Sequence, residues 1–384
     1  MASPQNQDIS MRPVFREDHE QFREQARRFI EREIVPHLHA WEAEGIVPKS
    51  VWLKAGEAGL LCSTVPEAYG GAGGDFGHSA VMIEELARVN ATAVGFTTHS
   101  EIVAPYIVAY GTEEQKQRWL PKMVSGEMIG VIAMSEPGVG SDLRSMRTTA
   151  ARGNDTYIIN GQKTFITNGG NADLAVTATK LDPAAKELTL ICVETDRAGF
   201  SKGRRLEKIG LKGQDTSELF FDNVSVPMTN RLGEEGHGFK YLTHQLAWER
   251  TIIGIRAAAS IDSLIDQTIQ YTRDRKVFGK TVFDFQNTKF KLAECKAQAT
   301  MLRVFVDDCL AKAMRGELSA EVGAMCKLMG SEMQGKILDE LLQLHGGYGF
   351  MSEYMISRAW VDARVARIYG GTSEIMKEII SRSL

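Results

Sequence analysis

Glu249 and Arg250 are the residues of this chain whose types and spacing best suit acid–base chemistry. They are adjacent in the segment Leu246-Ala247-Trp248-Glu249-Arg250, within a stretch where apolar residues recur at helical spacing. A glutamate that is buried among apolar groups has a raised pKa and can remove a proton near neutral pH. A Glu-Arg pair on an amphipathic helix is more often a solvated ion pair. From these two residues alone, both interpretations stay open.

A second segment, residues 367–374, has the sequence Arg-Ile-Tyr-Gly-Gly-Thr-Ser-Glu. Gly370 and Gly371 have no side chain, so neither can act as a base. The backbone N–H of a glycine can still bind an oxyanion, and each such donor is worth about 2.7–4 kcal/mol in enzymes. Ordinary turn formation is the other explanation of a glycine pair. Acid–base chemistry at this segment therefore needs a side chain from elsewhere in the chain.

The elements that must position these residues follow in the order α, β, α. Apolar residues recur at three- and four-residue steps from Asp18 to about residue 124, which predicts helices. From about residue 128 the pattern changes to short strands, and Asn160-Gly161 predicts a hairpin with a type I′ turn. Further strands are predicted at 174–179, 188–193 and 218–226. After Gly238 the chain is helical, with one long helix that closes near Arg273 and periodic segments at about 284–315, 318–345 and 352–382.

This pattern predicts an α + β protein of three domains. We expect an N-terminal all-α domain over residues 1–127 and a small β-barrel or sandwich domain over 128–236. A helical domain over 237–384 completes the chain, and its period is that of a four-helix bundle. A chain of 384 residues exceeds the usual size of a single core, which agrees with this division.

Composition excludes several classes of function. With 43% hydrophobic and 24% charged residues and a net charge of -4, the chain has no electrostatic footprint for nucleic acid. No apolar run is long enough for membrane insertion. The five scattered cysteines indicate reduced thiols, and no cluster has metal-ligand spacing, so no metal is expected. The start, Met1–Asp8, has no targeting segment, which predicts a bacterial cytoplasmic protein or a processed mitochondrial matrix protein.

Several motifs, in order along nearly the whole chain, resemble those of the acyl-CoA dehydrogenases, flavoenzymes that desaturate acyl-CoA thioesters. They are residues 132–142 (Ile-Ala-Met-Ser-Glu-Pro-Gly-Val-Gly-Ser-Asp), 160–168 (Asn-Gly-Gln-Lys-Thr-Phe-Ile-Thr-Asn), 275–279 (Arg-Lys-Val-Phe-Gly), 343–347 (Gln-Leu-His-Gly-Gly) and 367–374. The resemblance implies the α, β, α architecture of that family and FAD as the cofactor.

The resemblance also implies where the base lies. In the medium- and short-chain branches of that family, the residue after the tyrosine matched by Tyr369 is the glutamate that removes the α-proton. Here that residue is Gly370. The long-chain and isovaleryl branches carry their base at the position matched by Glu249. We therefore expect Glu249 to be the base and Gly370 to donate its backbone N–H to the thioester oxygen.

Matching positions imply the remaining contacts. Those with the isoalloxazine are Ile132, Met134 and Ser135 on one side and Phe165 and Thr167 on the other. Contacts with the pyrophosphate, from a neighbouring subunit, are Arg275, Phe278 and Gln286. Contacts with the adenosine half are Gln343, Gly346, Gly347, Thr372 and Glu374. Contacts with the substrate are Ser141, which is also near the flavin, Arg250 and Gly371. When each position is considered alone, an aromatic residue in a strand more often belongs to the hydrophobic core than to a cofactor site, and a glycine pair more often forms a turn. Arg250 could instead orient Glu249 or form a structural ion pair.

The function implied is FAD-dependent α,β-dehydrogenation of an acyl-CoA to the trans-2-enoyl-CoA. The resemblance implies a homotetramer that passes electrons to an electron-transfer flavoprotein. Because the base has moved away from position 370, we expect tolerance of long or methyl-branched acyl groups. Two alternatives are an acyl-CoA oxidase that uses O₂ and a non-catalytic relative that only binds acyl-CoA or flavin.

Overall fold

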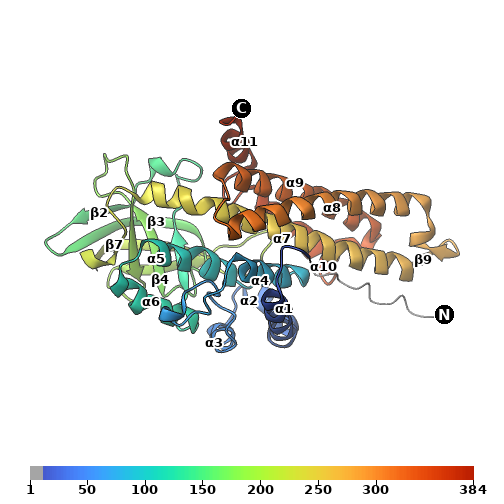
Figure 1. Ribbon diagram of the computed structural model, residues 1–384, viewed down its shortest axis with the longest axis horizontal. Helices are drawn as coiled ribbons and strands as arrows, with labels where there is room; N and C mark the ends of the chain where they lie inside the picture. Colours follow the sequence, from blue (N-terminus) through green and yellow to red (C-terminus); the bar gives the residue numbers. More distant parts are fainter. Residues whose placement is uncertain (1–11) are drawn as a thin grey trace.

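The computed structural model describes residues 12–384, and the elements follow in the predicted order of helices, strands and helices (Figure 1). The segment Met1–Asp8, in which the sequence predicts no targeting signal, lies outside the described residues. The predicted α + β architecture is confirmed. None of the described helices has a stretch apolar and long enough to cross a bilayer.

The N-terminal part is helical. Its α-helices are α1 (Glu17–Phe29), α2 (Leu38–Glu44), α3 (Lys49–Glu57), α4 (Phe76–Arg88), α5 (Ala104–Tyr110) and α6 (Glu113–Val124). Asp75 and Thr112 cap α4 and α6, because their side chains accept hydrogen bonds from backbone N–H groups of the first turn. A π-helical segment, Thr98–Val103, leads directly into α5. Such segments are rare and occur often at functional sites.

The middle part is built from two four-stranded sheets. The strands are β1 (Gly130–Ala133), β2 (Thr149–Arg152), β3 (Thr156–Thr167), β4 (Leu174–Thr179), β5 (Thr189–Glu194), β6 (Phe200–Arg205), β7 (Thr216–Pro227) and β8 (Arg231–Leu232). One sheet has the order β1-β4-β5-β8 and the other β2-β3-β7-β6. Only β1 and β4 pair in parallel within these two sheets. Buried side chains of both sheets, among them Val131, Tyr157 and Phe221, form one core.

The hairpin predicted at Asn160-Gly161 is wrong, because residues 156–167 form the single strand β3. The register with β7 shifts between Ile159 and Gly161, as at a β-bulge. A Cβ added at Gly161 would lie 2.5 Å from Thr148 Oγ1. The glycine therefore permits close approach of a neighbouring segment rather than a turn.

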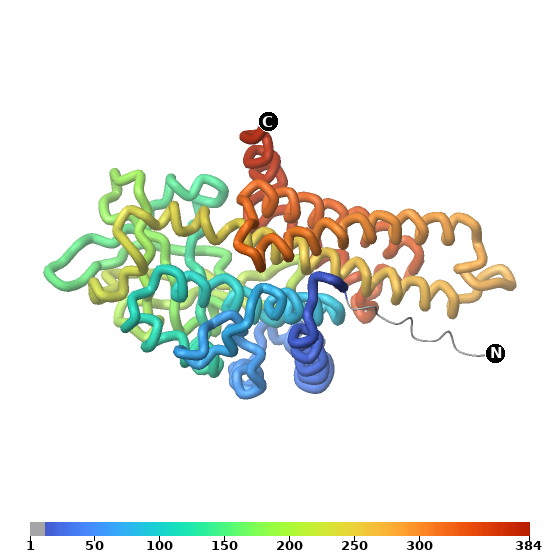
Figure 2. Tube along the Cα trace, viewed as in Figure 1, coloured from blue at the N-terminus to red at the C-terminus, as the bar shows by residue number. Residues whose placement is uncertain are grey.

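The C-terminal part is a helical bundle. Its α-helices are α7 (Gly238–Asp274), α8 (Gln286–Met314), α9 (Ala320–Leu344), α10 (Met355–Ala363) and α11 (Ser373–Ser381). A short hairpin of β9 (Lys276–Val277) and β10 (Lys280–Thr281) joins α7 to α8. The prediction of one periodic segment over 352–382 is corrected, because Gly370 and Gly371 have φ angles of 66° and 96° and separate α10 from α11. In Figures 1 and 2, α11 projects away from the bundle.

The helix α7 connects the regions of the molecule. Figure 2 shows it, in yellow, running from beside the strands to the far end of the bundle. Helices α7 and α9 cross closely at glycines, since a Cβ added at Gly330 would lie 2.9 Å from Gly254 Cα. The domain divisions after residues 127 and 236 stay predictions, and they lie between α6 and β1 and between β8 and α7.

Candidate active site

Glu249 lies on α7 directly after the buried Trp248, and only 7% of it is exposed. The rings of Phe76 and Trp248 pack beside each other with centroids 4.1 Å apart. Tyr106 Oη donates a hydrogen bond to Glu249 Oε1 at 2.9 Å. Burial raises the pKa of Glu249 to about 7, although the Tyr106 hydroxyl and the Arg250 charge oppose this rise. A carboxyl with this pKa can hold or release a proton at neutral pH.

Gly370 packs against the same face of α7 as Glu249. A Cβ added at Gly370 would lie 2.7 Å from Ile253 Cδ1. Ile253 follows Glu249 by four residues, so the two side chains are neighbours on one helix face. The chain thus brings Glu249 and Gly370 together, and Ile253 fills space that a side chain at position 370 would need.

Arg250 is buried, with 5% exposed, and its Nε has no hydrogen-bond partner among the described residues. Burial lowers its pKa, and the Glu249 charge opposes that effect. Buried donors without a partner are rare in folded proteins. An acceptor on a ligand would complete the hydrogen bonding of this guanidinium.

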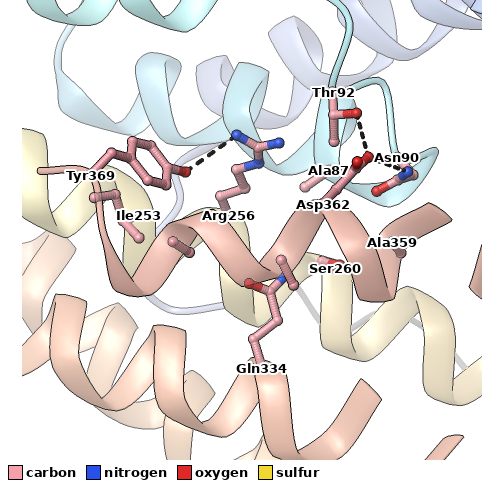
Figure 3. Close-up of a pocket in the computed structure, with 12 residues that line it drawn as sticks. Ala87, Asn90, Thr92, Ile253, Arg256, Ser260, Gln334, Ala359, Asp362 and Tyr369 are labelled. Atoms are coloured by element: carbon pink, nitrogen blue, oxygen red, sulfur yellow. Dashed lines mark hydrogen bonds between the residues drawn. The ribbon is translucent and has the colours of Figure 1, made fainter. Parts of the chain in front are cut away.

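The segment before Gly370 is held by contacts with all three regions. Asp362 on α10 accepts a hydrogen bond from Thr92 Oγ1 at 2.7 Å (Figure 3). It also accepts one from the backbone N–H of Leu211 at 2.5 Å. Asn90 also donates to Asp362, at 3.2 Å. Figure 3 shows Tyr369 beside Ile253 and reaching toward Arg256 on α7. The cavity between them has a volume of only about 20 Å³, which suffices for one water molecule.

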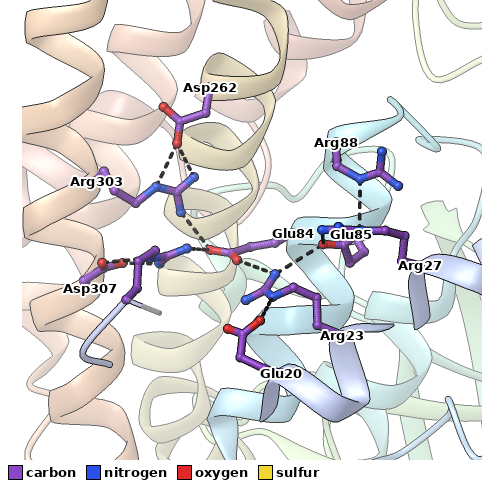
Figure 4. Close-up of polar contacts among 10 residues, drawn as sticks. Glu20, Arg23, Arg27, Glu84, Glu85, Arg88, Asp262, Arg303 and Asp307 are labelled. Atoms are coloured by element: carbon purple, nitrogen blue, oxygen red, sulfur yellow. Dashed lines mark hydrogen bonds and ion pairs between the residues drawn. The ribbon is translucent and has the colours of Figure 1, made fainter. Parts of the chain in front are cut away.

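A network of buried and partly buried charges fixes α4 and α1 against the bundle (Figure 4). Glu84 on α4 pairs with Arg12 at 2.7 Å, Arg23 at 3.0 Å and Arg303 at 2.7 Å. Burial opposes ionisation of Glu84, yet Arg303, Arg12 and Arg23 together lower its pKa. Arg303 also pairs with Asp262 of α7 at 2.7 Å, so the network joins α1, α4 and α8 to the helix that carries Glu249.

The residues expected on the two sides of the isoalloxazine lie together in the middle region. Ile132 is on β1, with Met134 and Ser135 directly after it, and Phe165 and Thr167 are on β3. Two hydrogen bonds join these segments, from Thr164 N–H to Ser135 O at 2.9 Å and from Lys163 Nζ to Met134 O at 3.1 Å. The Phe165 side chain is 69% exposed, and its φ of 59° is unusual for a non-glycine residue. An exposed aromatic ring held in this way fits a flat ligand better than a core role.

The residues expected at the pyrophosphate and adenosine lie mostly at the far end of the bundle. A cavity of about 420 Å³ there is lined by Arg275, His345, Gly346, Gly347 and Tyr348. Phe278 is 95% exposed at the tip of the β9–β10 hairpin. About 39 Å of helix separates Arg275 from Glu249, at about 1.5 Å per residue.

The other expected contacts are exposed or serve the local fold. Ser141 and Gln343 are exposed, as is Gln286 at the first turn of α8. Thr372 Oγ1 accepts a hydrogen bond from Ile375 N–H at 3.3 Å and so caps α11, and Glu374 is exposed in the first turn of that helix. Gly371 directly follows Gly370, and its carbonyl accepts a hydrogen bond from Lys327 Nζ at 2.6 Å.

One cluster of possible metal ligands, Asp18, His19 and His78, lies at the start of α1 and α4. His19 Nδ1 accepts a hydrogen bond from the Arg16 N–H at 3.1 Å, and His19 Nε2 lies 2.8 Å from Asp75 Oδ1. Both ring nitrogens of His19 are thus already engaged in capping the two helices.

Models of three acyl-CoA dehydrogenase domains match this chain in sequence. The N-terminal domain matches residues 16–127, the middle domain 131–224 and the C-terminal domain 236–384. The chain belongs to the acyl-CoA dehydrogenase family. It is therefore an acyl-CoA dehydrogenase, a flavoprotein enzyme that uses FAD. The exposed Phe165 and the cavity at Arg275 fit that cofactor.

Individual relatives of this acyl-CoA dehydrogenase cover nearly its whole length. The mitochondrial long-chain specific acyl-CoA dehydrogenase of Mus musculus is 46% identical over 98% of this chain and 89% of its own. The mitochondrial isovaleryl-CoA dehydrogenase of Oryza sativa is 35% identical over 97% and 92%. The crystal structure of an acyl-CoA dehydrogenase from Geobacillus kaustophilus superposes with a TM-score of 0.94, at 49% identity over 96% of this chain and 98% of that one.

Sequence reasoning did not predict Tyr106 and Lys327 as residues of this dehydrogenase's site. Tyr106 lies far from Glu249 in sequence and meets it only through the packing of α5 against the bundle, so no local pattern could identify it. Lys327 left a weak signal, since it is a lone lysine in the segment Gly323-Ala-Met-Cys-Lys-Leu-Met-Gly330. A charge in so apolar a stretch suggests a specific partner.

Proposed function

We propose that Glu249 is the base that removes the α-proton when this enzyme dehydrogenates an acyl-CoA to the trans-2-enoyl-CoA. The observation that carries the proposal is the buried Glu249 carboxyl. It accepts a hydrogen bond from Tyr106 and lies on the face of α7 against which Gly370 packs. The chain has no carboxylate at position 370, where an added Cβ would already lie 2.7 Å from Ile253 Cδ1.

Several residues of the chain contribute to proton removal. Glu249 takes the α-proton, and Tyr106 keeps the carboxylate oriented through its hydrogen bond to Oε1. The backbone N–H of Gly370 stabilises the negative charge that develops on the thioester oxygen. Bound FAD supplies the acceptor for the hydride from the β-carbon. Arg250 provides an unpartnered buried donor for the polar part of the substrate.

The binding of FAD is proposed to need two subunits. Ile132, Met134, Ser135, Phe165 and Thr167 would hold the isoalloxazine, while Ser141 would lie near both flavin and CoA. Arg275, Phe278, Gln286, Gln343, Gly346 and Gly347 would reach the rest of FAD from a neighbouring subunit, and Thr372 and Glu374 would contribute from the first. The long separation along α7 between Glu249 and Arg275 supports this arrangement.

An apolar stripe on α8 supports assembly into a homotetramer. Phe290, Met301 and Val304 are 58%, 65% and 67% exposed, and they follow a helical period with the exposed Ala297 between them. Exposed apolar stripes of this kind mark protein interfaces.

An electron-transfer flavoprotein is the proposed electron acceptor. The proposed location is a bacterial cytoplasm or, for a processed form, the mitochondrial matrix.

Long or methyl-branched acyl groups are the proposed substrates. The support is the position of the base on α7 instead of on the 370 turn, together with the names of relatives that act on long-chain and isovaleryl thioesters. Anaerobic titration of the holoenzyme with straight, 2-methyl and 3-methyl acyl-CoAs tests this by bleaching of the flavin absorbance. Turnover confined to short straight chains would contradict the substrate proposal.

The same titration separates the alternatives. Equal bleaching of wild type and Glu249→Gln would remove Glu249 from the mechanism. No bleaching by any thioester would favour a protein that only binds acyl-CoA. Rapid O₂ consumption without added acceptor would favour an oxidase over a dehydrogenase.

A further inference from the structure

Lys327 on α9 is a buried cation that the mechanism above does not use. Its side chain is fully buried, and Nζ donates a hydrogen bond to the carbonyl of Gly371 at 2.6 Å. No carboxylate lies within ion-pair distance of it among residues 12–384. A buried ammonium is costly unless it is paired, so its retention without a paired carboxylate calls for another explanation.

The crossing of α7 and α9 places Lys327 at the back of the 370–371 turn. Gly323 and Gly330 flank Lys327 on one face of α9, and both approach the backbone of α7, at Ala247 and Gly254. Lys327 therefore projects from the part of α9 that lies beside Glu249 and Arg250. Its only hydrogen-bond acceptor among the described residues is the turn that contains Gly370.

We propose that Lys327 is a positioning residue that holds the Gly370–Gly371 turn so that the Gly370 N–H faces the thioester oxygen, and that its charge favours the enolate. This inference rests on the proposed function and deepens it. Two successive residues of the turn have positive φ, and glycine backbone is the most flexible of all. A charge-assisted hydrogen bond to one carbonyl is a direct way to fix such a turn.

The direction of charge movement explains why the ammonium helps the reaction. Before proton removal the negative charge is on Glu249, and afterwards it is on the thioester oxygen beside Gly370. Lys327 contacts the Gly370 side, so its charge stabilises the product of proton transfer more than the reactant. Burial and repulsion from Arg250 lower the pKa of Lys327 to about 8, against the attraction of Glu332 and Glu374, so it stays charged at neutral pH.

The test uses the FAD-loaded enzyme with acetoacetyl-CoA, a thioester with an acidic α-proton whose ionisation is visible by ultraviolet absorbance. We expect Lys327→Met to raise the pKa of bound acetoacetyl-CoA by about one pH unit, equivalent to a tenfold loss of enolate stabilisation. We also expect kcat with a long-chain acyl-CoA to fall about 10- to 100-fold, with KM changed less than about threefold. Hydrogen–deuterium exchange of the peptide around residues 369–373 should accelerate.

Ser331→Ala is the matched control, because Ser331 is also fully buried on α9 and its hydroxyl donates within its own helix, to Leu328 O at 3.3 Å. It should leave the ligand pKa and the exchange rate unchanged. An unchanged ligand pKa in Lys327→Met would overturn the inference, whatever happened to stability. If Lys327→Met does not yield folded enzyme, Lys327→Gln is judged by the same criteria. Failure of the wild type to oxidise any acyl-CoA would instead refute the proposed function.

Discussion

Replacing Glu249 with glutamine should remove activity and at the same time stabilise the fold at alkaline pH. The carboxyl is buried, and its pKa is about 7 instead of the ordinary 4.5. The unfolded chain therefore releases this proton at lower pH than the folded protein does. The stability contributed by this residue is highest below pH 4.5, falls as pH rises to about 7 and is constant above that.

The size of this effect follows from the two pKa values. Because one pH unit is worth about 1.36 kcal/mol, the stability difference between Glu249→Gln and wild type should widen by about 2–3 kcal/mol from pH 5 to pH 8. Terms that do not depend on pH, such as the altered hydrogen bond from Tyr106, cancel in this comparison. The assay is the apparent melting temperature of both proteins at a series of pH values.

The same substitution should lower the catalytic rate. Loss of a general base costs about 10²- to 10⁴-fold, so kcat should fall by at least about 100-fold in Glu249→Gln. In the wild type, kcat/KM should rise with pH through about 7 as Glu249 loses its proton.

Glu101→Gln is a matched control for both effects. Glu101 is also buried, its carboxylate accepts a hydrogen bond from the Ser79 hydroxyl, and burial raises its pKa to about 7. The Glu101→Gln variant should therefore show the same pH-dependent gain in stability and keep the wild-type turnover rate. The reasoning is refuted if Glu249→Gln turns over at the wild-type rate, or if its stability difference from wild type does not depend on pH.

Three further predictions test the surroundings of the site. Gly370→Ala should lower kcat, because the alanine Cβ would lie 2.7 Å from Ile253 Cδ1 and the residue has a φ of 66°. Adding Ile253→Val should restore part of the lost kcat. If it restores nothing, the steric cause is refuted. Arg275→Ala should release FAD on gel filtration while the exposed neighbour Lys276→Ala retains it, and equal retention would refute a role for Arg275. Glu84→Gln should destabilise the fold by about 1.5–3 kcal/mol in urea unfolding, because three partly buried arginines lose a shared carboxylate although each keeps another partner. A loss below about 1 kcal/mol would show that the other partners and solvent already compensate the charges.

Periodicity predicted the long helices and the strands β4, β5 and β7, because residues that are buried on one face recur at a regular spacing in the sequence. The short strands β2, β6 and β8 were not predicted individually. Strand β4 was predicted at its observed bounds, and the long helix α7 was predicted to within a few residues. Asn160-Gly161 misled for a physical reason. Its glycine makes room for Thr148 within a strand, and a sequence cannot distinguish that need from the need for a turn.

The candidate site was only partly accessible to sequence reasoning. Glu249 and Gly370 could be named because the chain resembles a family whose base occurs at either of two positions. Tyr106 left no such signal, and the isolated Lys327 did not reveal its partner, since each acts through one hydrogen bond to a residue far away in the sequence. The π-helical segment before α5 also leaves no clear periodic signal, although it contains Glu101 and precedes Tyr106 by only a few residues.

Placing the base on α7 also explains why the turn at 370 can consist of glycine. Glu249 sits on a helix tied to the Glu84 network through the Asp262–Arg303 ion pair, and its carboxylate is oriented by Tyr106, so its position does not depend on the turn. The turn is then free to serve as a hydrogen-bond donor, which requires a fixed backbone but no side chain. Ile253 occupies the space that a base at 370 would need, and Lys327 supplies the restraint that two adjacent glycines lack. A carboxylate restored at position 370 should therefore work poorly unless Ile253 is also made smaller.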